Sequence, residues 1–85
     1  MEINITTGTS VNLYTALGVT VGSTKIKVQN KSDSPVYLTS NATEPTIKNE
    51  GLKIVANKEA INATSDAGAF ASAYLADVNI FVEVA

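Results

Sequence analysis

Apolar and polar residues alternate in short runs along this chain, and residues that favour turns separate the runs. The clearest run is the last one, where every second residue from Val78 to Val84 is valine or isoleucine. A period of two places alternate side chains on opposite faces of a β-strand. The pattern therefore predicts an all-β protein, with strands in residues 2–6, 11–14, 24–30, 36–39, 52–55, 69–75 and 78–84.

Runs of this length and spacing predict a small β-sandwich or barrel-like fold of six to seven mostly antiparallel strands. Residues 24–39 are expected to form an antiparallel hairpin around the turn at Lys31–Pro35. Two segments are ambiguous. Residues 57–66 could be strand, loop or one helical turn, and the alanines of 69–75 favour helix by propensity although the period favours strand.

The chain has 85 residues and no cysteine. It is expected to form a single β domain over residues 1–85. A domain of this size buries only about 60–65% of the surface that its unfolded chain exposes, and no disulfide can stabilise it. Packing against copies of itself or against another protein would supply the missing stability.

Side chains that usually perform chemistry are missing, since the chain contains no His, Cys, Trp or Arg. A paired-carboxylate mechanism could use Asp66, Asp77 and Glu83, but a chain this short leaves little room for a cleft. Oxygen ligands for Ca²⁺ could come from residues 32–34 or from the two glutamates of residues 44–50, where turn chemistry is the default interpretation. We therefore expect no enzyme activity, no cofactor and no metal.

Six lysines and eight acidic residues give a net charge of −2. The densest basic cluster is Lys25, Lys27 and Lys31, which is more typical of a solvated strand edge than of a phosphate-binding patch. The N-terminal residues lack the features of a signal peptide, and no apolar run reaches the roughly 20 residues of a membrane span. The sequence thus predicts neither a nucleic-acid nor a membrane partner, and synthesis in the cytoplasm.

Three aromatic residues are candidate interface anchors. Tyr14, Tyr37 and Phe81 each occupy the polar register of their strand, opposite the apolar residues that would fill the core. Aromatic side chains left outside a small sheet are favoured at protein interfaces. Two other interpretations are a sheet face covered by the protein's own loops, and a platform for glycans.

The first half of the chain resembles small virion proteins of tailed bacteriophages. The resemblance lies in Thr-Thr-Gly-Thr-Ser-Val-Asn-Leu-Tyr at residues 6–14, the Gly18–Gly22 step, Val-Gln-Asn-Lys at residues 28–31 and Pro-Val-Tyr-Leu at residues 35–38. It covers roughly residues 4–40, involves no catalytic motif and marks no binding residues.

The resemblance implies a structural part of a phage particle that is made in the cytoplasm of the bacterial host. Proteins of this kind decorate or cement the head, or serve as tail or fibre accessories, and often form trimers. We expect a capsid decoration protein that binds the major capsid protein and stabilises contacts between capsid subunits. The alternatives are a tail, adaptor or fibre accessory, and a free carbohydrate-binding or adhesion module.

Overall fold

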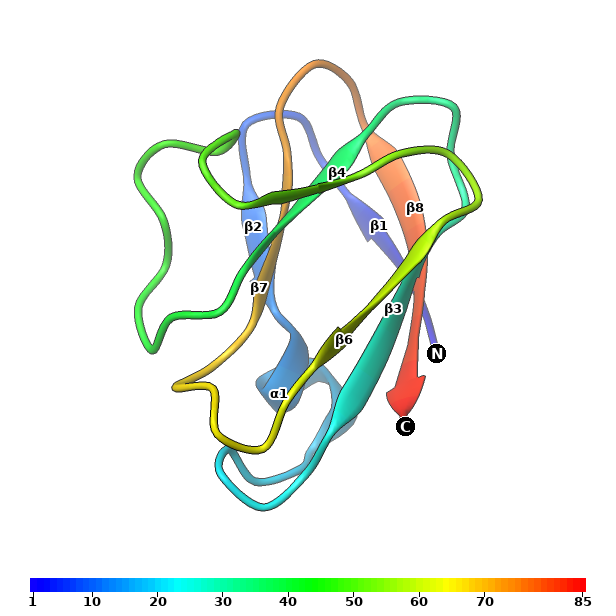
Figure 1. Cartoon of the computed structure of the whole chain (residues 1–85). Coiled ribbons are helices and arrows are strands. Elements are labelled where there is room, and N and C mark those ends of the chain that lie inside the picture. Colours follow the sequence, from blue (N-terminus) through cyan, green and yellow to red (C-terminus); the bar gives the residue numbers. More distant parts are fainter.

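The computed structural model describes residues 1–85 and consists of eight strands and one short helix (Figure 1). Two antiparallel sheets of four strands pack face to face, which confirms the predicted all-β sandwich. The strands are β1 (Glu2–Ile5), β2 (Ser10–Asn12), β3 (Ile26–Asn30), β4 (Val36–Thr39), β5 (Leu52–Ile54), β6 (Glu59–Asn62), β7 (Phe70–Ala73) and β8 (Val78–Val84), and the helix is α1 (Leu13–Leu17).

The expectation of six to seven strands was slightly low. The additional strand is β6, which lies in the segment that the sequence left ambiguous. Its short pattern, with one isoleucine between alanine and asparagine, carries little periodicity. Pairing with β3 holds it in an extended conformation, with Val28 opposite Ala60 and Ile26 opposite Asn62.

The strand order identifies the topology as a jelly roll. Sheet A has the order β1-β8-β3-β6, and sheet B has the order β2-β7-β4-β5. The chain folds back on itself as one long ribbon, in which β1 pairs with β8, β2 with β7, β3 with β6 and β4 with β5. Successive segments of the ribbon lie in opposite sheets, as in other eight-stranded jelly rolls.

The predicted hairpin over residues 24–39 was wrong, because β3 lies in sheet A and β4 in sheet B. The connection between them is held by the buried Asn30 amide, which donates to the carbonyls of Ser34 (2.8 Å) and Ile54 (2.9 Å). Its oxygen accepts the N–H of Ser32 at 2.8 Å. A strand–turn–strand pattern shows that two strands follow each other, but not that they pair.

The core fills the space between the sheets. It takes alternate residues from the central strands, such as Ile26 and Val28 of β3 and Ile80 and Val82 of β8. Ala71 and Ala73 supply the core side of β7, and Ala69 just before it is also buried in the core, so this segment is a strand in spite of its helical propensity. Burial by tertiary packing outweighs propensities of a few tenths of a kcal/mol per residue.

Helix α1 replaces the end of the strand predicted over residues 11–14. Asn12 caps its N-terminus by accepting the N–H of Thr15 at 3.2 Å, and Gly18 ends it with φ of 70°. An Asn before and a Gly after a short apolar segment are helix start and stop signals. This five-residue helix is neither long nor apolar enough to span a bilayer.

Candidate protein interface

The outer faces of the two sheets differ in what covers them. The outer face of sheet B, which we call the covered face, carries Tyr37, Phe70 and Ser72, and all three are buried. The segment 40–51, which joins β4 to β5, lies on this side of the molecule (Figure 1). Its Pro45 is buried, and we call this segment the lid.

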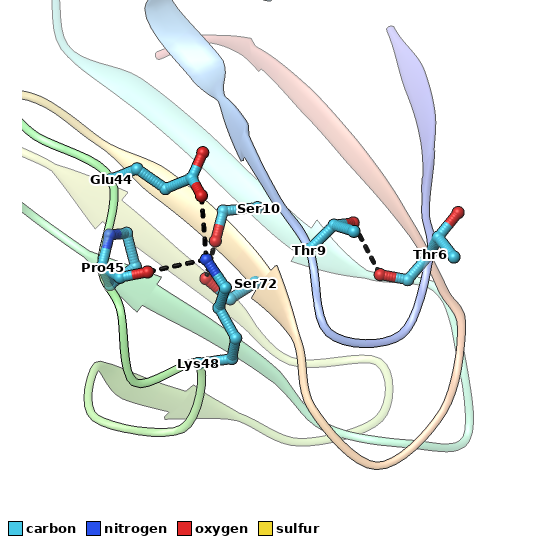
Figure 2. Close-up of polar contacts among 7 residues, drawn as sticks. All are labelled: Thr6, Thr9, Ser10, Glu44, Pro45, Lys48 and Ser72. Atoms are coloured by element: carbon cyan, nitrogen blue, oxygen red, sulfur yellow. Dashed lines mark hydrogen bonds and ion pairs between the residues drawn. The ribbon is translucent and has the colours of Figure 1, made fainter.

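Hydrogen bonds within the 40–51 segment stabilise its own conformation. The Lys48 ammonium donates to the Glu44 carboxylate (3.0 Å) and to the Pro45 carbonyl (2.6 Å), as Figure 2 shows. Beneath the segment, the hydroxyls of Ser10 and Ser72 are hydrogen-bonded at 2.7 Å (Figure 2). This leaves no unpaired polar side chain buried under the lid.

The outer face of sheet A, which we call the open face, has no such cover. Phe81 lies on the central strand β8 and is half-buried, with Glu2 of β1 and Gln29 of β3 directly beside it in the register. Cross-strand contacts organise the face, among them a hydrogen bond from the Asn4 amide to Asn79 at 2.8 Å. The open face comprises Glu2, Asn4, Lys27, Gln29, Glu59, Ile61, Asn79, Phe81 and Glu83.

Negative charge is concentrated on the open face. Lys27 lies between Glu83 (3.1 Å) and Glu59 (4.0 Å). Its hydrogen bond to Glu83 and the charges of the two glutamates raise the pKa of the lysine. With Glu2 the face carries three carboxylates and one ammonium, while the rest of the chain has five lysines and five acidic residues. The net charge of −2 therefore resides on this face.

Tyr14 is not an interface residue, contrary to the sequence-based expectation. It is 2% exposed, and its hydroxyl donates to the Thr24 carbonyl (2.8 Å) and accepts from the Asn62 amide (3.0 Å). The expectation assumed strand alternation, but α1 turns both Leu13 and Tyr14 inward. The asparagine cap and the following glycine were the signals that could have revealed this.

Tyr37 points away from the core as expected, yet it is only 9% exposed because it lies on the covered face. Its ring meets that of Tyr74 edge-to-face, at 6.3 Å between centroids and 88°. The outward orientation of the side chain was correct, and the accessibility was wrong. Phe81 alone of the three lies on a face that the chain leaves uncovered.

The three carboxylates considered for a paired-carboxylate mechanism each interact with a different partner. Asp66 accepts the N–H of Ala63 within its turn, and Asp77 accepts the N–H and the hydroxyl of Thr7, both at 2.7 Å. Glu83 pairs with Lys27, so the three carboxylates do not converge. No group of three His, Cys, Asp or Glu side chains is placed to hold a metal, and the surface has no pocket.

Comparison with known proteins gave no match for this chain, either among protein-family models, among curated proteins or among solved structures.

Proposed function

We propose that this protein is a non-enzymatic structural component of a phage particle, and that its open face binds another virion protein. The favoured role is a capsid decoration protein, which binds the outer capsid surface and stabilises contacts between capsid subunits. The observation that carries the proposal is the contrast between the faces. The chain closes one outer face with its own segment and leaves the other uncovered, with Phe81 at its centre.

The fold and the sequence supply independent support. The jelly-roll topology occurs in viral capsid and lectin domains, an analogy at the level of the fold alone. The resemblance of roughly residues 4–40 to small phage virion proteins points in the same direction. Neither argument names a binding residue, so the face is assigned from its exposure, its charge and its aromatic residue.

The mechanism would be the burial of apolar area around Phe81 inside a rim of charged and polar residues. Burial contributes about 25 cal/mol per Å² before the cost of association is subtracted. The acidic rim selects a partner surface with lysine or arginine around an apolar recess, and it makes association dependent on ionic strength. Many copies on one particle bind together through avidity, even where a single contact is weak.

A matched pair of variants tests the assignment. Phe81→Thr removes the anchor but keeps a residue that favours strands, and Tyr74→Thr removes an aromatic side chain that is 46% exposed elsewhere. Particles are grown from the genome that encodes the chain, carrying either variant, and the copies per particle are counted by quantitative mass spectrometry. We expect Phe81→Thr to reduce incorporation at least tenfold and Tyr74→Thr to leave it unchanged.

The same count distinguishes the roles within a particle. A decoration protein is present in copies on the order of hundreds, and a tail or fibre accessory in about a dozen, because each follows the symmetry of its site. Absence of the chain from purified particles would contradict the proposal. Normal incorporation of Phe81→Thr would contradict the assignment of the open face.

A carbohydrate-binding or adhesion module is the second candidate, and the Tyr37–Tyr74 pair favours it. An exposed ring such as that of Tyr74 can stack on the apolar face of a sugar. A glycan array with the wild-type protein and Tyr74→Thr tests this role. Binding that disappears in Tyr74→Thr but persists in Phe81→Thr would place the function at this pair instead of at the open face.

A further inference from the structure

Most polar side chains of the open face are bonded to one another, in the Asn4–Asn79 pair and in the ion pairs of Lys27. The Glu2 carboxylate and the Gln29 amide are the exceptions, because neither forms a side-chain hydrogen bond or an ion pair within the chain. These two residues are the direct neighbours of Phe81, on β1 and on β3. The groups on the open face that lack a partner therefore lie around its aromatic ring.

The backbone register brings these groups together. Met1 and Val82 exchange both of their backbone hydrogen bonds, at 2.8 and 2.9 Å. Glu2 and Phe81 are the next pair along the ladder, and their Cα atoms therefore lie only about 4.5 Å apart, as in other antiparallel pairs without hydrogen bonds. Gln29 lies opposite Phe81 on the other side, with about 4.5–5.5 Å between Cα atoms. A carboxylate, a ring and an amide thus form one row across three strands.

We propose that Glu2, Phe81 and Gln29 form a binding site for one arginine side chain of the partner protein. The guanidinium group stacks on the Phe81 ring and donates two hydrogen bonds to the Glu2 carboxylate. The amide oxygen of Gln29 accepts a third. The inference rests on the proposed function, since it names the chemistry of the partner at the same face.

The three groups suit arginine better than lysine. A guanidinium is planar and weakly hydrated, so it can stack on a ring while its five N–H donors reach a carboxylate and an amide oxygen. A lysine ammonium is a compact and strongly hydrated charge, which gains less from an aromatic face. An arginine is therefore the side chain that uses the ring, the carboxylate and the amide together.

No cation of this chain fills the site. The ammonium of Lys27 is held by Glu83 at 3.1 Å, and the N-terminal ammonium donates to the Val82 carbonyl at 2.8 Å. The chain contains no arginine. A second copy would therefore offer no guanidinium and would bring its own net charge of −2 toward an acidic face. The occupant is a different protein that carries an exposed arginine.

An NMR titration of the isolated protein tests the site with two capped peptides, acetyl-Gly-Arg-Gly-amide and acetyl-Gly-Lys-Gly-amide. The ionic strength is kept at about 10 mM, where screening is weak. We expect saturable shifts of the Phe81 ring and of the Glu2 and Gln29 side chains with the arginine peptide, with a dissociation constant on the order of millimolar. The lysine peptide should bind at least threefold more weakly.

Matched variants assign the contributions. Glu2→Gln removes the charge and should weaken the arginine peptide at least threefold, as should Phe81→Leu, which keeps an apolar side chain but removes the ring. Glu50→Gln is the control, because Glu50 is also exposed and forms no ion pair. Affinity equal to the wild-type value is expected for this control.

Three results would overturn the arginine site: no saturable shift, equal affinity for both peptides, or equal weakening by Glu2→Gln and Glu50→Gln. The proposed function fails on a different measurement, the count of this chain in particles. If the peptide does not bind but Phe81→Thr is still lost from particles, the arginine site is rejected and the proposed function stands. If the peptide binds but the chain is absent from purified particles, the site stands and the proposed function is rejected.

Discussion

Sheets A and B have four strands each and the same alternation of side chains, yet the outward residues on the central strands of sheet B are buried and those on the central strands of sheet A are not. On sheet B the outward residues Tyr37, Phe70 and Ser72 are buried, and the segment 40–51 lies on this side of the molecule (Figure 1). The connections that lead into β6 and β8 of sheet A, residues 55–58 and 74–77, have only four residues each. Loop length, and not strand sequence, decides which outward residues are available for binding.

The two phenylalanines provide the strongest test of this contrast. Phe70→Ala on the covered face should reduce the free energy of unfolding by about 3 kcal/mol, because it empties a buried site. Phe81→Ala on the open face should cost about 1 kcal/mol or less, since the ring is half-buried. Urea denaturation of both variants measures the difference, and equal losses would show that both faces are part of the core.

The close approach of the lid to β4 can be tested at Gly51. A Cβ at this position would overlap the Leu38 carbonyl and the Thr39 hydroxyl, so Gly51→Ala should cost about 2 kcal/mol through displacement of the segment. Gly8→Ala is the control, because its Cβ meets nothing within 4 Å and only its positive φ of 81° is unfavourable. Faster proteolysis of residues 40–51 in Gly51→Ala, and not in Gly8→Ala, is the expected observation.

The buried hydrogen bonds of Tyr14 on α1 predict a smaller loss of stability. Tyr14→Phe removes the hydroxyl between the Thr24 carbonyl and the Asn62 amide and should cost about 1–2 kcal/mol, because both groups lose a partner. Tyr37→Phe is the matched control on the covered face. Thermal unfolding of the two variants measures the difference, and an unchanged midpoint for Tyr14→Phe would mean that water replaces the lost hydroxyl.

The smallest expected effect is a pH dependence of the two connections between the sheets, because Asp77, between β7 and β8, binds Thr7, between β1 and β2. Hydrogen bonds from the Thr7 hydroxyl and N–H hold the pKa of Asp77 below its ordinary value of 3.8. The stabilisation is therefore present above that value and is lost as the pH falls through the lower pKa of the folded state.

Thermal melts between about pH 5 and pH 2.5 should show a smaller loss of stability in Asp77→Asn than in the wild-type protein. Glu44→Gln removes a carboxylate that does not contact Thr7, and it should follow the wild-type curve. Identical curves for Asp77→Asn and the wild-type protein would show that the Thr7 contact contributes no measurable stability.

The sequence by itself determined the β class, most strand positions and the direction in which Phe81 and Tyr37 point, because a period of two is a local property of the backbone. It did not determine that β3 and β4 lie in different sheets, since pairing depends on residues far apart in the chain. Helix α1 was signalled by Asn12 and Gly18, but the apolar alternation of Val11 and Leu13 concealed it.

Only the tertiary structure decided which aromatic residue remains accessible. Tyr14, Tyr37 and Phe81 have similar local patterns. They differ because Tyr14 lies in a helix against the core, Tyr37 is buried on the outer face of sheet B beside Tyr74, and Phe81 lies on an uncovered sheet face. The burial of a side chain depends on which segments, distant in the sequence, pack against it in space. Alternation within a strand carries no information about that packing. The candidate interface is therefore a property of the packing of loops on sheets.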